Sequence, residues 1–246
     1  MNYNWNWGVF LQEAPSGADT YLGWLLTGLK WTLLLSLSAW AVALAVGGIV
    51  GVLRTAPGRA LSLAAASYVE VFRNIPLLVQ LFIWYFVLPE LLPVKMGDAF
   101  KQMNPLAQQF IAAWLCLGLF TAARVAEQVR AGIQSLPPGQ KNAGLALGFT
   151  LPQTYRYVLL PMAVRIVVPP LTSEFLNIFK NSAVATTIGL IELSRQAQQL
   201  VDYTAQPFEA FIAVTALYLM LNVTIMSIMR KVERMLRVPG FIVAGK

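Results

Sequence analysis

Ionisable and amide side chains recur on one face of an otherwise apolar stretch near residue 175. In "LTSEFLNIFKNS", Glu174, Asn177 and Asn181 are spaced i, i+3 and i+7, while Ser173, Asn177 and Lys180 are spaced i, i+4 and i+7. Such spacings place side chains on one face of a helix. Because an ionisable group inside a membrane is costly unless it is paired or hydrated, this face is a candidate lining for a solute path.

The alternative is that these side chains form a structural network within the protein and contact no solute. Glu174 and Lys180 could pair and hold helices together, and for any single residue the sequence leaves both interpretations open. The candidate path residues are Glu174, Asn177, Lys180, Asn181 and Ser182.

A second pair of charges lies in "YVEVFRN". Glu70 and Arg73 are three residues apart, share a helix face, and are predicted to form a structural ion pair. A substrate contact for Arg73 is the less favoured alternative. Packing is also the predicted role of Gly47, Gly48 and Gly51, which would permit close approach of a neighbouring helix.

Several kinds of chemistry are poorly supported. The chain has no histidine and one cysteine, Cys116, so it lacks the commonest general base and metal ligand and cannot form an internal disulfide. A membrane enzyme, a metal site and a resident cofactor are therefore not expected. No G-x-x-x-x-G-K-[ST] stretch occurs, so any ATP and Mg²⁺ would be bound by another chain.

The composition indicates an all-α polytopic membrane protein. The 246 residues are 57% hydrophobic and 12% charged. A spanning helix needs about 20 apolar residues, and five stretches qualify. The predicted spans are 22–53, 61–88, 107–126, 156–180 and 208–229. Pro76 is a candidate kink in the second span, and Pro161, Pro169 and Pro170 are expected to break the fourth.

Lysines and arginines predict the orientation, because cytoplasmic loops retain them. One side holds only Lys95, Lys101 and Arg195, and four further cations are not assigned to a side. The other side holds eleven: Arg54, Arg59, Arg124, Arg130, Lys141, Arg156, Arg230, Lys231, Arg234, Arg237 and Lys246. Asn2 is therefore predicted outside and Lys246 inside, with residues 127–156 cytoplasmic. The net charge of +7 is then explained by the excess of lysine and arginine on the cytoplasmic side, which faces anionic lipid. It implies no nucleic-acid partner.

The stretch "QKNAGLALGFTLPQTYRYVLLP" (140–161) interrupts the apolar pattern. A helix is predicted after Pro137-Pro138-Gly139, ending near Gly148, and a second begins at Pro152. Small residues on this segment, Ala143, Gly144 and Gly148, would face a docked partner. An amphipathic helix lying on lipid is the alternative.

The spacing of this segment carries a resemblance. Asn142-Ala143-Gly144, three residues, Gly148, nine residues, Val158, one residue and Leu160-Pro161 resemble the EAA loop of binding-protein-dependent ABC importer permeases. In that family the loop is a coupling helix in a groove of a cytosolic ATPase. The implied coupling residues are Asn142, Ala143, Gly144, Gly148, Leu160 and Pro161. Asn142 replaces the usual Glu, and Gly144 replaces the usual Ala.

Other stretches extend the resemblance over nearly the whole chain. "YVEVFRNIPLLVQLFIWYFVLP" (68–89) and "GLFTAARVAEQVRAGIQSLPPGQ" (118–140) resemble spans of the polar amino acid permease branch. "NWNWGVFLQ" together with residues 171–193 is similar to a permease subunit of bacterial glutamate/aspartate importers. Relatives that carry cationic amino acids often place Asp after the counterpart of Lys180, whereas Asn181 stands here, which favours an anionic substrate.

The resemblance implies a type I ABC importer permease fold, with one transmembrane domain over 1–246 and a coupling loop at 136–160. It implies a multi-pass protein of the bacterial inner membrane. Its implied partners are a cytosolic ATPase dimer, a second permease subunit (homologous or identical), a periplasmic amino-acid-binding protein and membrane lipid. Alternatives are a permease for glutamine, histidine or arginine, or an ion-coupled secondary transporter, which usually has more spans and internal repeats.

Overall fold

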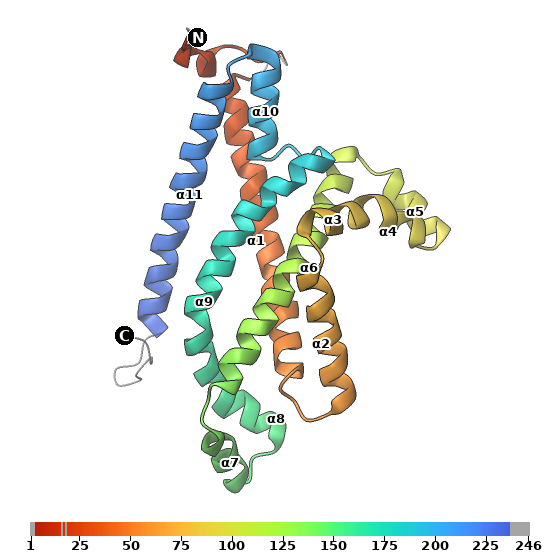
Figure 1. Ribbon diagram of the computed structural model, residues 1–246, viewed down its shortest axis with the longest axis vertical. Helices are drawn as coiled ribbons and strands as arrows, with labels where there is room; N and C mark the ends of the chain where they lie inside the picture. The colour runs from red at the N-terminus through yellow and green to blue at the C-terminus, as the bar shows by residue number, and fades with distance from the viewer. Residues whose placement is uncertain (1–2, 16, 18, 237–246) are drawn as a thin grey trace. The chain divides into compact units, whose positions relative to one another are not determined.

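The computed structural model describes residues 3–15, 17 and 19–236, and most of these are helical (Figure 1). Asn2, Arg237 and Lys246, used above to predict orientation, lie outside the described residues. The extended pairing found in the described chain is an isolated bridge between Glu13 and Thr20. The predicted all-α class is confirmed.

Four helical stretches are long and apolar enough to cross a membrane. They are α1 (Tyr21–Leu53), α6 (Pro105–Gln134), the run Leu151–Ile188 that contains α9 (Leu160–Asn181), and α11 (Pro207–Leu236). A fifth is reached only if α2 (Arg59–Asn74) and the run Leu77–Leu91 count as one bent span. The described residues therefore provide four to five candidate spans.

The second predicted span is two helical pieces. Ile75 is extended at φ −92° and ψ 130°, because a residue followed by proline is pushed out of the helical region. After Pro76, α3 (Leu77–Phe82), the π-helix η2 (Ile83–Val87) and α4 (Leu88–Leu91) follow in sequence. The predicted kink at Pro76 is confirmed as an interruption between α2 and α3.

The fourth predicted span is not broken by its prolines. Pro161 follows the π-helical residues 155–159 inside the continuous helical run Leu151–Ile188, and Pro169 and Pro170 lie inside α9, which continues. They remove hydrogen bonds without ending the helix. A π-helix, η3 (Tyr155–Leu159), precedes α9, and a 3₁₀-helix, η4 (Ser182–Ile188), follows it and ends at Gly189, with φ 90°.

The chain forms two compact units, described separately below. The first comprises residues 1–39, 76–117 and 178–224, and the second residues 40–75, 118–177 and 225–246. Each of the four long helices contributes a segment to both units. The division therefore cuts across these four helices, and its boundary at residues 75 and 76 falls in the connection between α2 and α3.

In the first unit, the short helix α10 (Leu193–Thr204) packs against α1 and α11. Leu25, Leu193, Ala197 and Val214 form its buried apolar cluster. Glu192 caps α10 by accepting the N–H of Arg195 at 2.9 Å. This unit also contains α3, η2, α4 and η4, together with the 3₁₀-helix η1 (Trp7–Leu11) and α5 (Val94–Lys101).

In the second unit, α1 approaches α6 closely at two glycines. A Cβ on Gly47 would lie 2.6 Å from the Ala122 carbonyl oxygen, and one on Gly51 would lie 2.6 Å from Val129 Cβ. Their four-residue spacing places both on the face that meets α6. A Cβ on Gly48 would have no atom within 4 Å, so the predicted packing role is wrong for this glycine.

This contact predicts a difference between neighbouring glycines. Gly47→Ala and Gly51→Ala force α1 away from α6, and each should lower the free energy of unfolding by about 1–3 kcal/mol. Gly48→Ala should leave stability unchanged or raise it by up to about 1 kcal/mol, because alanine favours helix. Thermal unfolding of the purified protein in detergent measures both. Equal midpoints for the three variants would contradict the close packing.

Candidate functional site

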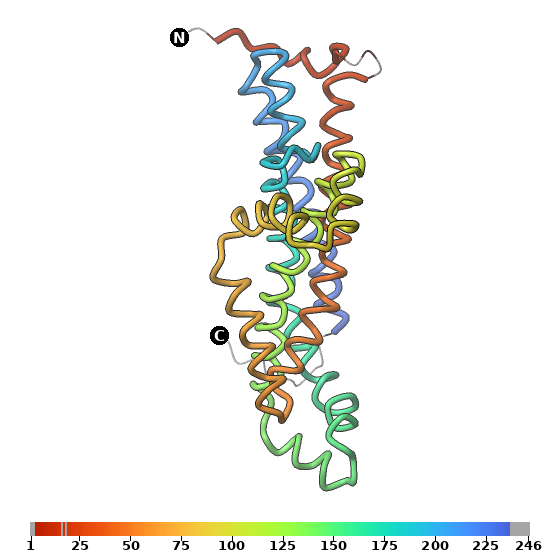
Figure 2. The backbone as a smooth tube through the Cα atoms, turned by 90° about the vertical axis from the view of Figure 1, so that its right-hand side faces the viewer, coloured from red at the N-terminus to blue at the C-terminus, as the bar shows by residue number. Residues whose placement is uncertain are grey.

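Two short helices follow α6 and form a loop hairpin within the second unit. These are α7 (Pro138–Ala146) and α8 (Leu151–Thr154), and both views show them beyond the ends of α6 and α9 (Figures 1 and 2). At the end of α7, Gly148 has φ 83°, and the Phe149 N–H donates to the Gly144 carbonyl at 3.2 Å. This is a Schellman motif, which requires a left-handed residue. The predicted stop near Gly148 is confirmed.

A capping box starts α8. The Gln153 side-chain oxygen accepts the Thr150 N–H at 2.8 Å and the Thr150 hydroxyl at 3.0 Å. Gln153 therefore takes part in the cap of α8, and losing such a cap costs about 0.5–2 kcal/mol.

The hairpin exposes apolar side chains. Leu147 is 76% exposed and Tyr157 59% exposed, and Leu145 is also exposed. Of the predicted coupling residues, Asn142, Ala143 and Gly148 are exposed, Leu160 begins α9, and Pro161 follows it. Exposed apolar residues grouped on one loop suit contact with a partner.

Gly144 departs from the prediction that it faces a partner. It is buried, and a Cβ there would lie 2.8 Å from Thr154 Cγ2. Its small size lets α7 pack against α8. The role of Gly144 in the described structure is therefore internal to the hairpin.

The hairpin is attached to the α1–α2 connection. The Tyr155 hydroxyl donates to the Thr55 carbonyl at 2.7 Å and lies 3.2 Å from the Thr55 hydroxyl. Below it, Ile133, Leu136 and Leu159 belong to a buried apolar cluster with Tyr155. Both contacts fix the hairpin to the body of the second unit.

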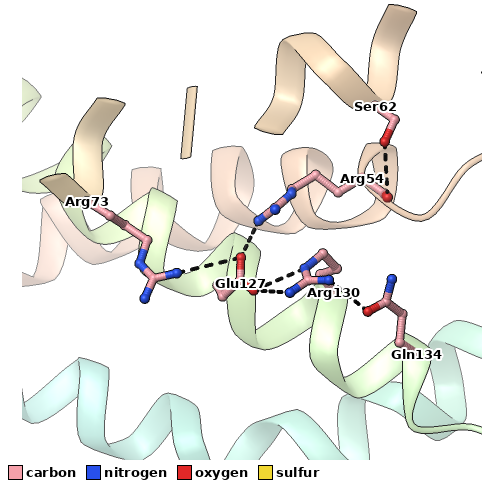
Figure 3. Close-up of polar contacts among 6 residues, drawn as sticks. All are labelled: Arg54, Ser62, Arg73, Glu127, Arg130 and Gln134. Carbon is pink, nitrogen blue, oxygen red and sulfur yellow. Dashed lines mark hydrogen bonds and ion pairs between the residues drawn. The ribbon is translucent and has the colours of Figure 1, made fainter. Parts of the chain in front are cut away.

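Three arginines lie around the carboxylate of Glu127, and one of them, Arg54, directly precedes Thr55. Figure 3 shows Arg54, Arg73 and Arg130 around Glu127 of α6. Arg54 and Arg130 form ion pairs with it, the Nε of Arg130 donating at 3.0 Å, and Arg73 Nη1 lies 3.8 Å from Glu127 Oε2. Arg130 also donates to Gln134 at 2.8 Å. We call these four charged residues the Glu127 centre.

The contact between Arg73 and Glu127 differs from the predicted Glu70–Arg73 pair. Arg73 contacts Glu127, whereas Glu70 is exposed. The i, i+3 spacing permits a local pair, but α2 packs on α6 through Val69, Ala123 and Ala126, and this packing brings Arg73 beside Glu127 instead. Sequence reasoning missed Glu127 because it counted Arg54 and Arg130 only as topology markers. The signal it could have used is the Glu127–Arg130 spacing in "EQVR".

The two ionisable residues on the polar face of α9 belong to different units. Glu174, in the second unit, is buried and lies 3.9 Å from Arg124 Nη1 of α6. Lys180, in the first unit, is exposed.

The other candidate path residues have different surroundings. Ser173 is exposed and Asn177 half-buried. In the first unit, Asn181 lines a small cavity with Leu81 and Cys116. Ser182 is buried and donates to the Phe179 carbonyl at 2.7 Å, so its hydroxyl is engaged within its own helix. No group of three or more potential metal ligands occurs among the residues that the structure describes.

A polytopic helical chain with a loop hairpin between α6 and α9 is the architecture of a membrane permease component. Residues 43–238 match the family described as "Binding-protein-dependent transport system inner membrane component", and the chain belongs to this family. The chain is therefore a multi-pass transport component of the inner membrane, and the expectation that it is not an enzyme agrees with this family.

The chain is also similar to individual members of this family. The chain is 57% identical to the glutamate/aspartate import permease protein GltJ of Escherichia coli K12 over 241 residues, covering 98% of both chains. It is 36% identical to a probable glutamine ABC transporter permease protein GlnM of Bacillus subtilis 168, covering 80% of this chain and 85% of that one.

Solved structures show the same fold. A structure described as an amino acid ABC transporter with histidines has a TM-score of 0.74 and 33% identity, covering 87% of this chain and 94% of that chain. An inward-facing MetNI methionine ABC transporter chain has a TM-score of 0.71 at 23% identity, covering 92% and 100%. The type I importer permease fold is thereby supported.

The Glu127 centre predicts a stability effect. Glu127→Gln leaves three arginines without their shared countercharge, so it should lower the free energy of unfolding by about 1–3 kcal/mol, less than for a fully buried pair because Glu127 is partly exposed. Glu70→Gln is the matched control and should change little. Thermal unfolding in detergent tests both, and comparable losses for the two variants would refute the assignment.

Proposed function

We propose that this chain is a permease subunit of an ATP-driven importer that moves glutamate and aspartate from the periplasm to the cytoplasm. The observation that carries the proposal is its 57% identity to GltJ, named as a glutamate/aspartate import permease, across 98% of both chains. Such identity over the full length leaves the spans and connecting loops in correspondence.

The proposed energy input comes through the hairpin. Leu145, Leu147 and Tyr157 are exposed beside Ala143 and Gly148, and these apolar groups suit a groove on a cytosolic ATPase. The ATPase dimer binds ATP and Mg²⁺ in this proposal, and this chain holds no cofactor. The hairpin is accordingly cytoplasmic, the C-terminus lies on the same side and the N-terminus is periplasmic, as the lysine and arginine distribution favours.

A second permease chain and a periplasmic amino-acid-binding protein complete the proposed complex. The family description, which names binding-protein-dependent transport, supports a binding-protein partner. We assign the path to the polar face of α9 and its continuation. Lys180 is exposed there, and its neighbour Asn181 adds no negative charge, which suits an anionic amino acid.

A permease for another polar amino acid is the second candidate. The 36% identity to the probable glutamine permease GlnM favours it. The two candidates differ in the charge of the substrate, so a direct uptake comparison separates them.

Reconstitution tests the proposed function. The chain, its copurifying second permease and ATPase, and the binding protein are placed in proteoliposomes with internal ATP. We expect ATP-dependent uptake of labelled glutamate and aspartate, with little uptake of glutamine, histidine or arginine. Uptake of glutamine in preference to glutamate would establish the second candidate instead.

Coupling through the hairpin predicts selective loss of the ATPase. Ala143→Asp and Leu147→Asp place an unpaired charge in the contact while leaving the spans untouched, and each should reduce copurified ATPase and uptake at least about tenfold. Gly148→Asp should act alike. Gly148→Ala controls for left-handed backbone strain, because its side chain adds no charge. Full ATPase retention in the Asp variants at matched permease levels would indicate a lipid-surface hairpin.

A further inference from the structure

Arg124 is an arginine inside a candidate span. It lies within α6, ten residues before that helix ends at Gln134, so it stands well inside the helix. An ionisable residue in such a position is costly and needs a partner or a function. The Lys and Arg count treated Arg124 only as a marker of orientation.

The pairing of Arg124 with Glu174 is loose. Arg124 Nη1 lies 3.9 Å from Glu174 Oε1, beyond hydrogen-bond distance. Neither Arg124 Nε nor Glu174 Oε2 has a hydrogen-bond partner among the described residues, although both atoms are buried. Unmade hydrogen bonds at buried charged atoms are expensive, so this arrangement is suited to accept further groups.

Arg124 is more exposed and less tightly paired than Arg54 of the Glu127 centre. There Arg54 is 13% exposed and bonded directly to its carboxylate. The Arg124 side chain is 42% exposed, and the Phe120 ring lies 4.9 Å from its guanidinium carbon. The ring supports the guanidinium from one side, while the exposed part keeps N–H groups free.

We propose that Arg124 and Glu174 form a binding site for an acidic amino acid, in which Arg124 binds the side-chain carboxylate and Glu174 accepts the ammonium group. This inference rests on the proposed function and adds the residues that select the substrate. A guanidinium donates two parallel hydrogen bonds to a carboxylate, which an uncharged amide cannot match. The buried Glu174 Oε2, which lacks a donor, gains one from the ammonium group.

In the proposed site, each of the two residues binds a different group of the substrate, which can be tested with two analogues. Binding of labelled glutamate to the purified permease–ATPase complex is measured without binding protein, in competition with glutamine and with glutarate. Glutamine lacks the side-chain carboxylate, and glutarate lacks the ammonium group. In the wild type, glutamate should compete better than either analogue.

Each variant should remove discrimination against one analogue. Arg124→Gln should weaken glutamate between about tenfold and a hundredfold, to the level of glutamine. Glu174→Gln should weaken it to the level of glutarate. Arg165→Gln, at an exposed arginine of α9 in the same unit, is the matched control and should leave all three affinities unchanged.

Folding is kept separate from binding by a double variant. Arg124→Gln with Glu174→Gln removes both charges, so neither is left unpaired, and the complex should assemble at the wild-type level while losing both preferences. Unchanged glutamate affinity in the double variant overturns the inference, as does equal weakening of glutamate and glutamine in Arg124→Gln. Either result leaves the proposed function intact if the wild type takes up glutamate in proteoliposomes. Failure of that uptake removes the proposed function itself.

Discussion

The second unit depends on the carboxylate of Glu127. Three guanidinium groups from the end of α1, the last turn of α2 and α6 itself lie around it, and like charges this close would repel without it. Each arginine comes from a different part of the chain, so one side chain fixes the relative positions of three helical segments. The close glycine contacts between α1 and α6 are compatible with this arrangement because they bring the two backbones together.

The loop hairpin is continuous with this centre. Tyr155 bonds to Thr55, and Thr55 is adjacent to Arg54, whose guanidinium meets Glu127. One hydrogen bond, one peptide unit and one ion pair therefore link the hairpin to Glu127, in addition to the direct chain connection from α6 into α7. Arg73 extends the same connection to the last turn of α2, directly before the interruption at Pro76. Contiguous hydrogen bonds and ion pairs of this kind can carry energetic coupling between two sites.

Sequence reasoning succeeded where local chemistry decides the structure. The interruption at Pro76 and the helix end near Gly148 follow from the geometry of single residues, and both were predicted. It failed where partners come from distant segments. Arg73 had a local candidate in Glu70, and only the packing of α1, α2 and α6 reveals the stronger one. The same holds for Glu174, whose partner lies on another helix, and for Gly144, whose size is required by Thr154.

The π-helix at Tyr155–Leu159 sets the direction in which the hairpin points. A π turn holds one residue more than an α turn, and each residue of an α-helix turns the chain by about 100°. Removing one residue here would restore a regular helix and rotate α8, which directly precedes it, by roughly that angle about the axis of α9. Tyr155 would then leave Thr55, and Leu147 and Tyr157 would face a different side of the protein. The additional residue of the π-helix thus determines the angle at which the exposed loop leaves the helix. The register of the span after it is unchanged.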